Sequence, residues 1–279
     1  MRFEDNPDDY EREQRKAIQT WKEKPPPIIE RGLGYFFKPI AWLIGQVVPP
    51  SAIEGALKGA DWLARQTLSE ERVFREAGVK NADDLKRLKL SDLDALANHF
   101  HQWALGYAVI QGGAAGAIGL PGIAVDVPSL VTMAIRTVRG IGVCYGYISG
   151  NEAEREFVLG VLAAAGANSL AEKTTALLFL RRLEVTLLKQ TFKAMTAKAA
   201  EQTLSKEAAI IALRDLTRQL GVNLTKRKML QVVPFVGAAV GATVNWKFMD
   251  DIAWTARRAY QERWFSDQDE VSQLAAATR

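Results

Sequence analysis

The sequence has almost no cysteine or histidine. Cys144 is the only cysteine, and His99 and His101 are the only histidines among 279 residues. One cysteine cannot close an internal disulfide bridge, and no signal-peptide pattern follows Met1, so we expect a reducing, cytosolic compartment. The two histidines lie on different sides of a helix because they are two residues apart, and no CxxC or HExxH motif is present. The sequence therefore predicts no metal site.

The signatures of common reactions are also missing. No Lys-Ser or Lys-Thr follows the glycine run GGAAGAIG, which excludes a Walker-type phosphate loop, and no GxSxG elbow is present. Cys144 lies between Val143 and Tyr145, where a small core residue is the expected role. No nucleophile, base and orienting group stand out together, so we expect a protein that is not an enzyme and binds no cofactor.

Strand signals are equally scarce, and helix signals take their place. The chain has no Asn-Gly or Asp-Gly hairpin turn and no regular short strands, whereas capping residues recur along its first third. These caps are Ser51 with Glu54, Ser69, Asn81, and Ser91 with Asp94, and the helix that Ser69 opens is expected to end near Gly78. With 48% hydrophobic residues, the sequence predicts an all-α fold with a single multi-helix domain over residues 21–264. A charged N-terminal tail over 1–20 and a C-terminal tail over 265–279 are expected to flank it.

The first unusual segment, Trp103 to Val125, has twenty-three residues without a charge. Its length would permit a membrane span, but its many glycines and Pro121 make it a poor transmembrane helix. Glycines recur every three residues and would leave a groove in which another helix could approach closely. These glycines are Gly113, Gly116, Gly119 and Gly122.

A second glycine-rich segment, Leu230 to Trp246, echoes the first and carries Gly237 and Gly241 at GxxxG spacing. Each segment leads into a stretch that carries carboxylates and then arginines, which indicates an internal pseudo-repeat. We expect both segments to form helices packed in the core. The candidate ion-pairing residues are Asp126, Arg136, Arg139, Asp250, Asp251 and Arg258.

Asp126 is the carboxylate of most interest, because it follows the apolar run LPGIAV. It could cap a helix, or it could be buried and paired with Arg136, Arg139 or a cation of a C-terminal helix. A buried Asp126 in a pocket would be the weak candidate for a catalytic residue.

Positive charge gathers between Lys173 and Lys228, where twelve Lys or Arg and four acidic residues give +8. The predicted contacts to an anionic surface are Arg182, Lys189, Lys193, Lys226, Arg227 and Lys228. Lipid headgroups are the favoured partner; nucleic acid is unlikely because only Phe179 and Phe192 could stack on bases there. A solvated helix face is the alternative, and Glu184 within the apolar arc favours packing against protein.

Three segments of the chain resemble the EcsC protein family. They read PIAWLIGQVVPPSAIEGAL, GLPGIAVDVPSLVTMAIRTVRGIGVCYGY and VVPFVGAAVGATVNWKFMDDIAWTARRAY. The resemblance covers about Trp21 to Trp264, and the family takes its name from a gene that accompanies an ABC-transporter ATPase and its membrane subunit.

The resemblance and the basic region together predict a non-enzymatic helical protein. It would act at or near the cytoplasmic membrane face, peripheral at the inner face of the cell membrane, as a partner of a membrane or transport assembly. The alternatives are a hydrolase-like enzyme that uses an Asp126 pocket and a soluble cytosolic scaffold.

Overall fold

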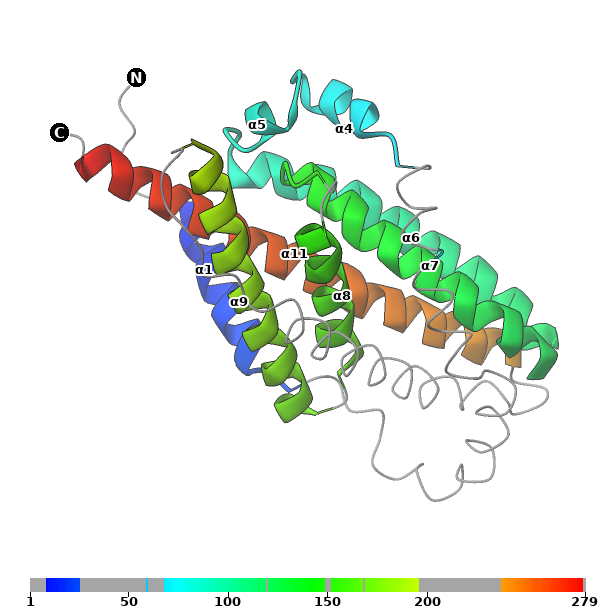
Figure 1. Ribbon diagram of the computed structural model, residues 1–279. Helices are drawn as coiled ribbons and strands as arrows, with labels where there is room; N and C mark the ends of the chain where they lie inside the picture. Colours follow the sequence, from blue (N-terminus) through cyan, green and yellow to red (C-terminus); the bar gives the residue numbers. More distant parts are fainter. Residues whose placement is uncertain are drawn as a thin grey trace.

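The computed structural model describes residues 9–25, 59, 68–118, 120–148, 152–167, 169–195 and 237–277 (Figure 1). Within these ranges the chain consists of helices and their connecting turns, and none of the described residues lies in a strand, which confirms the all-α class. The helices are α1 (Asp9–Glu23), α4 (Glu70–Ala77), α5 (Ala82–Leu85), α6 (Leu90–Ile118), α7 (Leu120–Cys144), α8 (Glu152–Gly166), α9 (Leu170–Met195) and α11 (Gly237–Ala277). The helix predicted to start at Ser51 lies outside the described residues, apart from position 59.

The predicted stop at Gly78 and the predicted cap at Asn81 are confirmed. Gly78 ends α4 in the left-handed conformation with φ of 69°, and its N–H donates to the carbonyls of Arg75 and Phe74. The Asn81 side chain accepts a hydrogen bond of 3.0 Å from the Asp84 N–H and so begins α5. These local signals work because each satisfies backbone groups that a helix end leaves unpaired.

The charge-free segment does not form one helix. Helix α6 ends at Ile118 and α7 begins at Leu120, with Pro121 in its first turn, where a missing N–H costs nothing. The segment is therefore divided between two helices that pack on each other. None of the described helices is both long enough and apolar enough to cross a membrane.

Helix α11 is the central element of the described fold and runs along most of its length (Figure 1). It packs most extensively on α6 and also contacts α7, α8 and α1. Side-chain contacts show that α6 and α11 run antiparallel, since His101 meets Asp250 whereas Asp94, earlier on α6, meets Gln261, later on α11. One long helix thus supplies a surface on which the other helices assemble.

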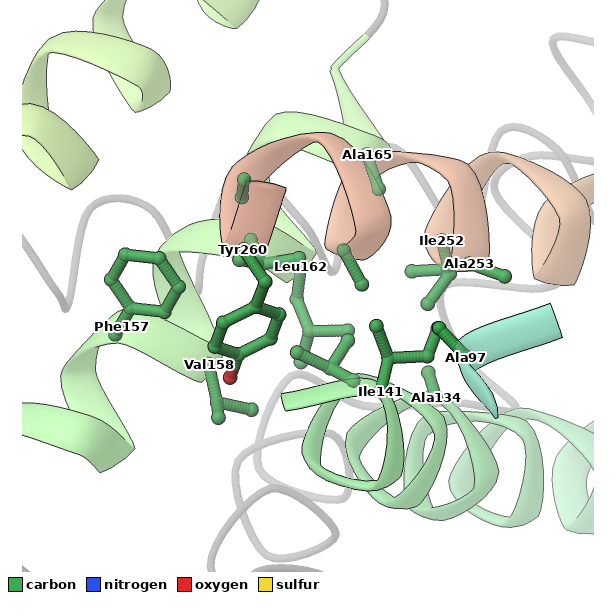
Figure 2. Packing of buried hydrophobic residues seen from close by; sticks show 14 of the residues in the cluster. Ala97, Ala134, Ile141, Phe157, Val158, Leu162, Ala165, Ile252, Ala253 and Tyr260 are labelled. Carbon is green, nitrogen blue, oxygen red and sulfur yellow. The ribbon is translucent and has the colours of Figure 1, made fainter. Parts of the chain in front are cut away.

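The core lies where α6, α7, α8 and α11 meet, and Figure 2 shows Tyr260 pointing between Phe157 and Ile141. The Tyr260 ring lies 5.1 Å from the Phe157 ring, centroid to centroid. Gly142 makes room for it, because a Cβ at Gly142 would lie 2.6 Å from the Cζ atom of Tyr260. Close packing around a fixed aromatic ring therefore requires glycine at position 142.

The two ends of the chain differ from the tails that the sequence predicted. Residues 9–20 belong to α1 and residues 265–277 belong to α11, and Arg15 joins the two helices through Asp269 at 2.7 Å. Lys173 on α9 closes the other end of α1 by donating to the carbonyls of Trp21 and Lys24. Arg15, one of the charged residues that suggested a solvated tail, finds its partner 254 residues away, which local composition cannot show.

Candidate functional site

The predicted carboxylates lie on two helices, α7 and α11. Asp126 lies on α7, but its side chain is outside the described part of the structure. Arg139 is buried on the same helix, and the Arg136 guanidinium stacks over the Trp103 ring at 5.0 Å. The predicted pairing of Asp126 with either arginine stays a prediction.

Asp250 and Asp251 lie on α11 beside Lys247, whose ammonium group is 3.7 Å from Asp250 and 3.0 Å from Asp251. Arg258 instead donates to the side-chain carbonyls of Gln14, at 2.7 Å, and Gln261, at 2.8 Å. The geometry at Lys247 is an ordinary helix-surface ion pair one turn apart, which contributes little to stability.

The predicted basic contacts are only partly described. Arg182 is exposed on α9, whereas the side chains of Lys189 and Lys193 and all of Lys226, Arg227 and Lys228 lie outside the described residues. Glu184, on the same helix, is buried and pairs with Arg181 at 3.0 Å. Burial, together with the nearby carboxylate of Glu262, raises the pKa of Glu184 to about 7.

For most of the predicted helix-packing glycines, the structure likewise does not describe the surroundings. Gly113 is half-buried, and the surroundings of Gly116, Gly119, Gly122, Gly237 and Gly241 are not described. Among the glycines that the structure does describe, close approaches occur at Gly140, against Phe100, at Gly142, against Tyr260, and at Gly160, against Leu180. The glycine-rich segments and the pseudo-repeat that they suggested therefore remain predictions.

The sequence missed a buried polar network around Asp94. Its carboxylate accepts hydrogen bonds from the Tyr10 and Tyr145 hydroxyls and two from the Gln261 amide, at 2.7 and 2.8 Å. Asp94 was expected to take part in a helix cap, but it lies within α6, which begins at Leu90. Its position one turn from Leu90 and Ala97, on the buried face, is the signal that could have revealed it.

This network is closed to further ligands. A carboxylate has about four acceptor positions, and Asp94 uses four hydrogen bonds from three side chains of this chain. Burial and the neighbouring Asp94 raise the pKa of the Tyr145 hydroxyl well above its ordinary value, so it remains a donor. Asp94 thus ties α1, α11 and the turn after α7 to α6 and has no free acceptor for a substrate.

A second buried network joins α8 to α11. Arg263 makes a two-pronged ion pair with Glu154, at 2.8 and 2.6 Å, and both side chains are almost completely buried. The Arg263 guanidinium also lies 3.9 Å from the centroid of the Tyr147 ring, and the Tyr147 hydroxyl donates to Asp267 at 3.0 Å. The rigid fork of arginine suits this geometry, which positions α8 rather than a ligand.

The remaining chemically capable groups are also held internally. His101 is buried, with Nε2 3.0 Å from Asp250, and burial lowers the pKa of its imidazole. The Cys144 thiol donates to the Gly140 carbonyl at 3.3 Å, and burial raises its pKa well above the ordinary range, which disfavours a nucleophilic thiolate. Among the described residues, no cluster of three His, Cys, Asp or Glu side chains could hold a metal ion.

The surface feature that these internal contacts leave unexplained is the exposed face of α6. In the first half of the helix this face carries Asp92, His99 and Gln102, whereas from Trp103 onward none of its side chains is charged and Gln111, at its edge, is half-buried. Ile110 is 75% exposed and Ile118 is 65% exposed, values unusual for isoleucine. An apolar face on an otherwise well-packed helix is a candidate interaction surface.

The fold and this surface define a helical domain with closed buried networks and one exposed apolar end. The chain belongs to the EcsC protein family, whose model matches residues 12–265. It is also similar to YdbA, an uncharacterized protein of Bacillus subtilis (strain 168), with 24% identity over 202 residues that cover 70% of this chain and 69% of YdbA. No solved structure matches the chain.

Proposed function

We propose that this protein is a non-enzymatic helical protein that acts at or near the cytoplasmic face of a membrane, as a partner of a membrane or transport assembly. The observation that carries the proposal is the exposed face of α6, which turns from polar to apolar at Trp103 and keeps Ile110 and Ile118 in solvent. Such a face loses free energy in water and gains it against a lipid or protein surface.

The buried charged groups support a non-enzymatic role. Asp94 and Glu154 are buried carboxylates, and both oxygens of each accept hydrogen bonds from side chains of the same chain. Groups held in this way position helices, because a catalytic carboxylate must leave at least one oxygen available to the reacting molecule.

Flotation of the full-length protein with liposomes tests the proposal. Anionic and neutral vesicles would each be used at low and at high salt, because added salt shortens the range of attraction between exposed charges. Flotation with anionic vesicles that is lost at high salt would support contact through the basic region. Flotation with both vesicle types that survives high salt would support contact through the apolar face.

A charge-reversal variant sharpens this test. Arg182→Glu combined with Lys189→Glu and Lys193→Glu should weaken salt-sensitive flotation, and Arg87→Glu is the matched control, since its side chain is 80% exposed on the α5 side of the fold. Absence of flotation in every condition would contradict direct membrane contact and favour a soluble scaffold that binds proteins.

A further inference from the structure

We infer that the apolar half of the exposed face of α6 enters the interfacial region of one lipid leaflet, with Trp103 at its boundary. This inference rests on the proposed function and names the element that touches lipid. The inference is that a lipid surface covers this face. Coverage by a second copy of this chain, or by another part of the same chain, would contradict it.

The exposed residues form one continuous stripe, which we call the α6 stripe. It consists of Trp103, Tyr107, Ile110, Ala114 and Ile118. The spacings of three and four residues place all of them on the same side of the helix, over about 22 Å of its length. A continuous apolar stripe of this kind is what a helix lying at a membrane surface presents.

The opposite side of the same helical segment is already occupied. Ala104, Ala108 and Ala115 are buried, on the helix that packs against both α7 and α11. Because the alanine side is held by the domain, the stripe cannot turn inward without undoing that packing. The stripe is therefore a fixed outer surface of a folded domain.

The order of residues along the stripe matches the order of environments at a membrane surface. Fully exposed charged and amide side chains end at Gln102, the aromatic rings of Trp103 and Tyr107 follow, and Ile110 and Ile118 lie beyond them with the half-buried Gln111. The Arg136 guanidinium stacks on Trp103, so the cation lies at the aromatic boundary. Tryptophan and tyrosine favour the headgroup level, arginine extends toward water, and aliphatic side chains favour the acyl chains.

The neighbouring helix repeats this order. Trp246 and Trp254 are exposed on α11, which packs along α6, and the antiparallel register places Trp246 at about the level of Leu105. The Trp254 ring contacts His101 and lies under the guanidinium of Arg257, at 4.6 Å. From Gly237 to Trp246 the helix has no charged residue, and charges resume at Lys247. Charge is thus absent from the same end of both helices.

A spin label would locate the stripe directly. The full-length protein would carry a nitroxide at Ile118→Cys, or at Leu178→Cys as the matched control, because Leu178 is an exposed aliphatic residue on α9 with 58% exposure. Cys144 is fully buried, so the introduced cysteine is the accessible thiol. The rate at which the label collides with oxygen, which enters lipid, is compared with the rate at which it collides with a water-soluble nickel complex. Both rates are measured with and without neutral liposomes.

Substitution supplies the second measurement. Ile110→Asp combined with Ile118→Asp should lower the liposome partition coefficient at high salt at least about tenfold, because each buried isoleucine contributes roughly that factor. Leu178→Asp, the control, should leave the partition coefficient within about twofold of that of the parent protein. Both variants change exposed residues, so helical circular dichroism should be unchanged.

The expected result is that liposomes shield the label at 118 from nickel and increase its collisions with oxygen, while the label at 178 stays accessible to nickel. If the protein floats but the label at 118 remains open to nickel, this inference is overturned while the proposed function stands. If the label at 118 is shielded from both reagents without liposomes, protein covers the stripe and the inference is also overturned. If nothing floats, the proposed function itself fails.

Discussion

Tyr10, near the start of the chain, donates a hydrogen bond of 2.6 Å to the Oδ2 atom of Asp94, although 84 residues separate them. The contact attaches α1 to α6 at a carboxylate that also holds Tyr145 and Gln261. The Gln261 carbonyl accepts from Arg258 while its amide donates to Asp94, so the amide can lie in only one orientation. The first helix is therefore part of the packed domain and shares a polar network with it.

Removal of the central carboxylate should be the most damaging change in this network. Asp94→Ala would leave the buried Tyr145 hydroxyl and Gln261 amide without their acceptor, and we expect the free energy of unfolding to fall by about 3 to 5 kcal/mol. Tyr10→Phe removes one donor at a half-buried position and should cost about 1 to 2 kcal/mol. Urea denaturation would measure both effects. Asp92→Ala, at an exposed position of the same helix, is the control and should lower the free energy of unfolding by under about 1 kcal/mol. Equal effects for Asp94 and Asp92 would contradict the network.

The Glu154–Arg263 pair should show strong coupling. Arg263→Met leaves a buried carboxylate unpaired and should lower the free energy of unfolding by about 3 to 5 kcal/mol, as should Glu154→Leu. The double variant should cost much less than the two single changes together, because neither charge is then left alone. A double-mutant cycle by urea denaturation measures this, and additive effects would show that the two side chains act independently.

Glu184 should make stability fall as pH rises. Its pKa of about 7 in the folded state lies above the ordinary 4.5, so between these values the folded protein binds a proton that the unfolded chain has released. Stability should therefore decrease from about pH 4.5 to pH 7 and then level off, by an amount on the order of 2 kcal/mol. Glu184→Gln should melt at a higher temperature than the parent at pH 8 and show little gain at pH 4.5. An equal gain at both pH values would assign the effect to packing instead.

Two glycines should respond in opposite directions to alanine. Gly142→Ala places a Cβ 2.6 Å from a Tyr260 ring that Tyr147 and Phe157 hold in place, and should cost about 1 to 3 kcal/mol. Gly106→Ala meets no atom within 4 Å and should raise stability by up to about 1 kcal/mol through helix propensity. Thermal denaturation distinguishes them, and similar shifts at both positions would contradict the packing at Gly142.

Prediction from the sequence succeeded where the cause was local. Gly78 and Asn81 end and begin helices through their own backbone and side-chain hydrogen bonds, so those boundaries were readable. The N-terminal tail was expected from local composition, but residues 9–20 form part of a helix. Arg15 of this helix pairs with Asp269, a contact that local composition does not reveal. Asp94 was misread for the same reason, since its partners come from two other helices and from the turn after α7.

The sequence by itself determined the all-helical class, the family resemblance and the charge-free segment that ends α6 and begins α7. Those properties follow from residue spacing, from the lack of strand and hairpin signals, and from turn chemistry within a few positions. Only the tertiary structure decided which charges are buried in pairs, which glycines face an aromatic ring, and which side of α6 remains in solvent. These depend on contacts between residues far apart in the chain, which exist only once the helices have packed on α11.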